Sequence, residues 1–206
     1  MTEPRIPLAS PHGNPGELQA LLDTLSRRGR PPLNIFLALA RHPDLLRDFL
    51  PLGARLLLTG TLPGRDRELV ILRTAWLCGC EYEWGQHQRL AAREGLSAAE
   101  IAGVTDPSAG HWSRHDGALL QATGELVGEH TISDASWKIL SETYDDAALV
   151  EFTILAGNYA MLAVLRDQAV VPVNAEARIA YALSLAAPQA LRAIARQGAR
   201  RSPLRS

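Results

Sequence analysis

The segment "RELVILRTAWLCGCEYEWGQHQRLAAREG", residues 67–95, decides the fold of this chain. Its first half is apolar almost all round, which is typical of a central helix that is buried on every side. Its second half is amphipathic at helical spacing and ends at Gly95, a residue type that often follows the last turn of a helix. Gly79 lies between the halves and is unfavourable inside a helix. The segment therefore predicts two helices with a break at Gly79.

The rest of the chain has the same helical character. Apolar residues recur at helical spacing from residue 16 to residue 187, whereas alternating Val, Ile and Thr runs and Asn-Gly hairpins are almost absent. A break is expected at Pro43, and caps at Ser97 and at Ser133 or Asp134 mark the beginnings of further helices. The sequence thus predicts an all-α protein of roughly eight to ten helices.

The chain is expected to form one domain with two distinct ends. Residues 1–15 contain four prolines and no apolar periodicity, so we expect a flexible segment or one that lies along a neighbour. Residues 16–187 form the single helical domain, because 206 residues with 47% apolar content suffice for one core. Residues 188–206 are rich in Arg and lack acidic residues, and we interpret them as a soluble basic tail.

Composition narrows the class of protein. A formal net charge of −1 argues against a general nucleic-acid or membrane-surface binder. The two cysteines are too close in sequence for a disulfide framework, and the first residues lack the layout of a signal peptide. No run of 18 uninterrupted apolar residues predicts a membrane span. We therefore expect a cytoplasmic protein with a small-molecule substrate, and no nucleic-acid or membrane partner.

The residues capable of chemistry cluster after the predicted break. At about 100° per residue, Cys80, Glu83 and His87 share one narrow helix face, whereas Cys78 points to the opposite side. Glu68 approaches from the preceding apolar helix, where a charge is unfavourable without a partner. A carboxylate and an imidazole one turn apart can exchange a proton. A thiol at a helix start beside a histidine can be activated, but a lone cysteine among bulky neighbours is more often a small buried hydrophobe.

Other polar and aromatic residues have competing interpretations. Tyr82 and Trp84 suit either substrate contacts or core and subunit contacts. His111, His115 and Asp116 form a second cluster that could reach the site from a loop, although a solvated helix start explains them equally well. Neither a paired Cys-x-x-Cys nor a zinc-binding histidine motif is present, and no Gly-rich phosphate loop occurs, so we expect no metal or other cofactor.

The motifs carry a family resemblance. The stretch "RDRELVILRTAWLCGCEYEWGQHQRLAAREGLSAAEIAGV", residues 65–104, resembles the core of the carboxymuconolactone decarboxylase and alkylhydroperoxidase D (AhpD) superfamily. The resemblance extends from about residue 33 to about residue 172 and includes "SWKILSETYDDAALVEFTILAGNYAMLAVL" at 136–165. It implies an AhpD-like all-helical, cofactor-free protein that is an obligate homo-oligomer, a trimer or a hexamer. Two very apolar segments also favour an oligomer.

The resemblance also implies roles for the clustered residues. In the peroxidase branch a glutamate is followed, after eleven residues, by Cys-x-x-Cys-x-x-x-His, which corresponds here to Glu68, Cys80, Glu83 and His87. Glu83 stands where that branch has the cysteine that attacks peroxide, and Cys80 matches the resolving cysteine. Cys78 lies outside the motif. The form Cys-x-Tyr-Glu-Trp-x-x-His is similar to the decarboxylase-like branch.

These implications lead to one expected function and two alternatives. We expect a carbon–carbon lyase or isomerase for a small carboxylated lactone or unsaturated acid, with His87 donating a proton and Glu83 and Glu68 setting its charge and position. Arg73 and Arg89 are both candidates for the substrate anchor, along with the aromatic residues above. The alternatives are a thiol peroxidase and a non-catalytic homologue.

Overall fold

The computed structural model describes residues 5–26, 31–109 and 112–169. These residues form nine α-helices with a π-helical turn (η1) and a short 3-10 turn (η2), and no strand occurs among them, which confirms the all-α prediction. The helices are α1 (Gly16–Leu25), α2 (Asn34–Leu39), α3 (Pro43–Ala54), α4 (Gly64–Leu77), α5 (Glu81–Arg93), α6 (Ala98–Gly103), α7 (Arg114–Glu129), α8 (Asp134–Leu140) and α9 (Asp146–Ala169), with η1 at Arg55–Thr59 and η2 at Pro107–Ala109.

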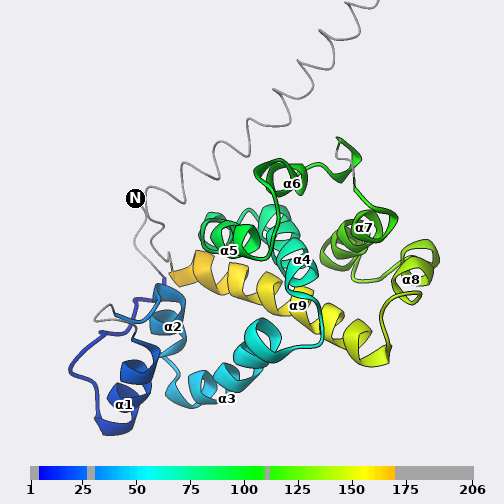
Figure 1. The fold of residues 1–206 in the computed structure, drawn as a ribbon. Coiled ribbons are helices and arrows are strands. Elements are labelled where there is room, and N and C mark those ends of the chain that lie inside the picture. The colour runs from blue at the N-terminus through cyan, green and yellow to red at the C-terminus, as the bar shows by residue number, and fades with distance from the viewer. Residues whose placement is uncertain (1–4, 27–30, 110–111, 170–206) are drawn as a thin grey trace, which may run out of the picture.

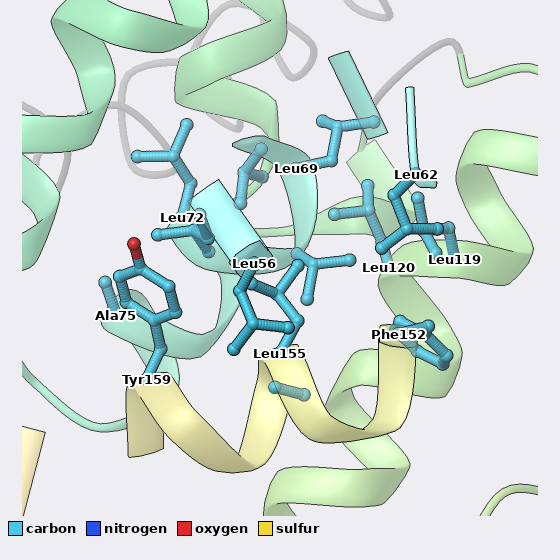
Figure 2. Close-up of a cluster of buried hydrophobic side chains, with 14 of the residues drawn as sticks. Leu56, Leu62, Leu69, Leu72, Ala75, Leu119, Leu120, Phe152, Leu155 and Tyr159 are labelled. Carbon is cyan, nitrogen blue, oxygen red and sulfur yellow. The ribbon is translucent and has the colours of Figure 1, made fainter. Parts of the chain in front are cut away.

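Helix α4 occupies the centre of the fold, between α5, α7 and α9 (Figure 1). Four successive residues, Leu69–Leu72, are fully buried, because neighbouring helices cover every side of α4. Figure 2 shows side chains of α9 and α7 packed against this helix; those labelled on α9 and α7 are Phe152, Leu155, Tyr159, Leu119 and Leu120. The all-round apolar sequence is thus explained by a helix whose central turn has no solvent face.

Helix α9 is the longest described helix and crosses beneath α4 (Figure 1). By length and composition alone it is the one helix of the described residues that could cross a membrane, and half of its most apolar window is buried inside the protein. Its contacts with α4, α7 and α2 are those of a core helix.

The predicted helix boundaries rest on local hydrogen bonds. His42 precedes α3, and its Nδ1 accepts from the amide of Leu45, while Pro43 begins the helix. Ser97 forms the expected capping box with Glu100. Such caps satisfy amides that have no partner within the helix.

Gly79 connects α4 to α5. Its φ of 63° lies in the left-handed region, which a residue without Cβ adopts with little strain. The amide of Cys80 then donates to the carbonyl of Ala75 at 2.8 Å. The predicted break is confirmed, and it turns the chain so that α5 packs along α4.

The two ends of the chain differ in what the structure describes. Residues 5–9 lie along the fold: the amide of Ile6 donates to the carbonyl of Gln168, and that of Ala9 to the carbonyl of Leu37. The predicted tail, 188–206, lies outside the described residues.

Candidate functional site

A buried carboxylate–imidazole pair links α4 to α5. Nδ1 of His87 lies 2.8 Å from Oε2 of Glu68, and 6% and 1% of the two side chains are exposed. A buried carboxylate without a partner is strongly unfavourable, so the Glu68 carboxyl requires this contact. The turn at Gly79 makes it possible because it places the His87 face of α5 against α4.

Glu83 flanks the other side of the imidazole. Its Oε2 lies 3.7 Å from Nε2 of His87, one helical turn away, and 6% of its side chain is exposed. Burial raises the pKa of Glu83, and the nearby His87 and Arg166 offset this only in part. The imidazole of His87 therefore lies between the carboxyl groups of Glu68 and Glu83. The raised pKa of Glu83 favours the neutral, protonated form of the Glu83 carboxyl group.

The two cysteines occupy different environments. Cys80 is buried at the position that precedes α5, whereas Cys78 is exposed at the end of α4. Burial raises the pKa of the Cys80 thiol to about 11, although nearby backbone amides and Arg166 partly counteract it. The thiolate is the reactive form of cysteine, so Cys80 is chemically quiet near neutral pH.

Helix α9 contributes two site residues that we did not predict. The ring of Tyr159 meets the ring of His87 edge to face, with centroids 5.0 Å apart, and burial raises the pKa of its hydroxyl. Arg166 is close enough for its charge to act on Glu83 and Cys80. Both positions fall in the stretch that carried the family resemblance, but an apolar helix so far along the chain does not reveal which face meets the histidine.

Arg67 is a third residue that we did not predict. Its Nε lies 3.5 Å from Oε1 of Glu68 and its Nη2 lies 3.2 Å from Oε1 of Glu94. The sequence feature that could have predicted this contact is the position of Arg67 directly before Glu68. The guanidinium bridges a buried and an exposed carboxylate, and this compensates the charge of Glu68.

The other candidate residues do not all reach the pair. Trp84 is fully buried and packs with its ring tilted on Trp76, and Tyr82 is buried in the same core. Arg73 donates from Nη1 to two backbone carbonyls of the loop after α6. Arg89 is exposed and donates to Gln86. The described contacts bring neither arginine to the pair.

The second cluster forms a separate network. Nε2 of His115 lies 3.2 Å from Oδ2 of Asp66 and 3.1 Å from the hydroxyl of Tyr144, which itself donates to Asp66 at 2.5 Å. Asp116 instead pairs with Arg65 at 3.0 Å. These contacts tie α7 and the loop before α9 to the start of α4, so His115 and Asp116 are neither at the His87 site nor at a freely solvated helix start. His111 lies outside the described residues.

Metal-ligating side chains do not converge in the described part of the chain. No group of three or more His, Cys, Asp or Glu residues there is arranged to hold a metal ion. The chemistry that the site itself can perform is proton transfer between an imidazole and two carboxyl groups.

Comparison with known proteins agrees with this geometry. The profile of the carboxymuconolactone decarboxylase family matches residues 43–110, which include the pair and the turn between its helices. No curated protein matches the chain.

Solved structures match most of the chain at low identity. An uncharacterised peroxidase-related protein from Ralstonia eutropha JMP134, described as an alkylhydroperoxidase AhpD core, has a TM-score of 0.71 and 20% identity, covering 86% of this chain and 95% of that one. A peroxidase-related protein from Silicibacter sp. TM1040 has a TM-score of 0.70 and 18% identity, covering 85% and 96%.

The debrominase Bmp8, solved in complex with 2,3,4-tribromopyrrole, has a TM-score of 0.66 and 13% identity, covering 81% of this chain and 88% of its own. These three structures share the fold of this chain. Together with the family profile, which covers α4 and α5, they support the resemblance to the carboxymuconolactone decarboxylase and AhpD superfamily.

Proposed function

We propose that this protein is a cofactor-free lyase or isomerase that transfers a proton on a small carboxylated lactone or unsaturated acid. The observation that carries the proposal is the imidazole of His87, held at Nδ1 by Glu68 and faced at Nε2 by Glu83. A buried acid–base group with fixed orientation is what proton transfer to carbon requires.

Each residue of the trio has a role in this reaction. Glu68 accepts from Nδ1–H and thereby fixes the tautomer and orientation of the His87 ring, so that Nε2 faces the substrate side. When a carbon–carbon bond to a carboxylate breaks, CO2 leaves and the bonding pair moves into the conjugated carbonyl. His87 then donates its Nε2 proton to the carbon that lost CO2, Glu83 returns a proton to Nε2, and a proton from solvent restores the Glu83 carboxyl group. An isomerase would use the same donor after a proton had been removed elsewhere on the substrate.

The low exposure of the site supports this chemistry. A charge-dispersed transition state is favoured over a localised carboxylate when water is excluded. The debrominase neighbour, solved with a halogenated pyrrole, is an example of a small unsaturated ring bound on the same fold. That this chain also binds a small unsaturated molecule is part of the proposal. A cytoplasmic location is proposed as well.

A thiol peroxidase using Cys80 is the second candidate, because two structural neighbours are described as peroxidase-related. Two features weigh against it. The position that would attack peroxide holds Glu83, and burial raises the pKa of the Cys80 thiol to about 11. A non-catalytic homologue remains the third candidate, which only an activity measurement separates from the first.

One experiment tests all three candidates. The purified protein is incubated with a panel of unsaturated lactones and muconate-type acids, with detection of CO2 and of changes in ultraviolet absorbance, and in parallel with peroxide and a thiol reductant. The proposal expects turnover of a carboxylated substrate and slow peroxide consumption. Rapid peroxide consumption that is lost in Cys80→Ser would establish the second candidate instead.

A further inference from the structure

Arg166 lies on the face of α9 that carries Tyr159. The two residues are seven positions apart, which is close to two helical turns, so their side chains project in nearly the same direction. The ring of Tyr159 contacts the ring of His87 at 5.0 Å. Arg166 therefore extends the wall that α9 contributes to the site.

The guanidinium of Arg166 is not committed within the described part of the chain. Its Nε is buried and has no hydrogen-bond partner there, and its nearest carboxylate oxygen, on the exposed Asp167, is 3.9 Å from Nη1. By contrast, Arg67 bridges two carboxylates and Arg73 holds two carbonyls. A buried donor without a partner is uncommon in folded proteins and calls for an explanation.

The side chain of Arg166 is more exposed to solvent than those of the trio. Its side chain is 20% exposed, compared with 6% for both Glu83 and His87 and 1% for Glu68. The positive charge of Arg166 also acts on Glu83 and Cys80, so its guanidinium is the more exposed charged group beside the trio.

We propose that Arg166 binds a carboxylate that the substrate retains throughout the reaction, while the reacting carbon lies against His87 and Glu83. This inference rests on the proposed function and specifies its substrate class: a small acid with a permanent carboxylate. The guanidinium fork suits bidentate recognition of a carboxylate and would give its buried N–H a partner. A carboxylate held this way is stabilised in the ground state, so it is not the group that leaves as CO2.

Equilibrium binding tests the anchor without requiring the true substrate. The probes are sorbate, a singly charged conjugated acid, and sorbamide, its uncharged amide, titrated calorimetrically into the full chain. The wild type is expected to bind sorbate more tightly than sorbamide. Arg166→Gln should weaken sorbate binding by about tenfold or more and leave sorbamide binding unchanged, since a charge-assisted hydrogen bond is lost. Arg166→Lys should lie between the two.

Matched controls separate an anchor from a structural residue. Arg93→Gln removes the same charge from an exposed position on α5 and should leave both affinities unchanged. Arg166→Gln should keep the wild-type melting temperature, because the described fold gives its guanidinium no hydrogen bond to lose. A large fall in melting temperature with loss of both probes would identify a structural role and overturn the inference, as would a wild type that does not distinguish the probes.

The inference and the proposed function can fail separately. If a substrate is found and Arg166→Gln turns it over with unchanged KM, the anchor is wrong and the proton-transfer function stands. If sorbate binding depends on Arg166 but no carboxylated substrate is turned over, the function is wrong and the anion site stands. Support for both requires a KM raised about tenfold in Arg166→Gln with a smaller change in kcat.

Discussion

At the scale of single residues, the site is defined by one carboxylate in the most apolar helix of the chain. Glu68 is fully buried, and only the contact with His87 and the bridge from Arg67 make that position tolerable. The pairing was anticipated from the sequence because a charge in such a helix needs a partner. The contribution of Arg67 was not, since an arginine at a helix start is usually solvated.

Substitution of the proton-transfer residues tests their roles directly. His87→Gln and Glu83→Gln should each lower turnover by about 100-fold or more, the usual scale for positioned acid–base groups. Both should also change the shape of the pH–rate profile, because each variant removes one of the groups that transfer the proton. Kinetics on the substrate found by the panel, with circular dichroism as the folding control, provides the measurement. Two variants with near wild-type rates would place the site elsewhere.

Stability should depend on pH through Glu83. Burial raises its pKa in the folded state, so its protonated form stabilises the fold below its unfolded pKa of about 4.3, and this stability is lost as pH rises through the folded value. Glu83→Gln cannot ionise at this position. The free energy of unfolding of this variant, relative to wild type, should therefore be larger at pH 8 than at pH 5. Urea denaturation at both values measures this.

Glu100 is the matched control for this pH effect. Hydrogen bonds from the backbone and side chain of Ser97, with one from Arg65, lower its pKa to about 2, so it is ionised in both states across that interval. Glu100→Gln should therefore be destabilising to the same extent at both pH values. If the difference in free energy of unfolding between Glu83→Gln and wild type is also the same at both pH values, the pKa of Glu83 is not raised.

Cys80 should be dispensable for the proposed reaction. In a Cys78→Ser background, alkylation of Cys80 by iodoacetamide should be slow at pH 7 and accelerate toward its pKa of about 11. Cys80→Ser should keep most of the lyase activity and lose little stability, because serine is a favourable residue immediately before a helix. Stoichiometric labelling at pH 7 would indicate an activated thiol and favour the peroxidase.

At the scale of secondary structure, the turn between α4 and α5 decides whether the trio assembles. Each helix could be recognised from its own apolar pattern, and the break from the glycine between them. The packing of α5 along α4 depends on the left-handed backbone of Gly79 and on the bond from Cys80 to Ala75. A small backbone feature thus controls the distance between Glu68 and His87.

Gly79→Ala should be destabilising by about 1–2 kcal/mol, the strain of a Cβ in the left-handed region. It should also reduce turnover, because a shifted α5 moves His87 away from Glu68. Gly128→Ala is the control: Gly128 lies in α7 with open space around its Cα, so alanine there should be stabilising by up to about 1 kcal/mol. Thermal unfolding compares the two, and equal effects would show that the turn is not strained.

At the scale of the whole molecule, α9 has an exposed apolar stripe formed by Val150, Ile154, Met161 and Val164. These residues are nearly symmetric about the exposed Gly157. An antiparallel second copy of α9 would therefore place Val150 against Val164 and Ile154 against Met161, which is the pattern of a two-fold contact. An exposed apolar stripe of this kind is typical of a protein–protein interface, and its symmetry favours a second copy of this chain as the partner.

We therefore propose a homo-oligomer, and of the trimer and hexamer expected from the resemblance the two-fold contact favours the hexamer. Sedimentation velocity at micromolar concentration should give six times the 22.3 kDa chain mass. Ile154→Glu should shift the protein to smaller species, whereas Leu45→Glu, at an exposed apolar position on α3, should not. A monomeric wild type would refute the oligomer.

The sequence by itself determined the helical class, the break at Gly79, the cap at Ser97 and the shared face of Glu83 and His87, and it narrowed the cap of α8 to Ser133 or Asp134, of which the structure has Ser133. All of these depend on neighbours within a few residues along the chain, and periodicity and local hydrogen bonding suffice to predict them.

Only the tertiary structure decided which helix completes the site. Tyr159 and Arg166 reach the trio because α9 packs against α4 at one rotation about its axis, and that rotation results from the packing of the whole core. The same packing directs Arg73 to the loop after α6 and ties His115 to Asp66, away from His87. Contacts between distant segments depend on how all the apolar faces are buried together, and no local pattern encodes that arrangement.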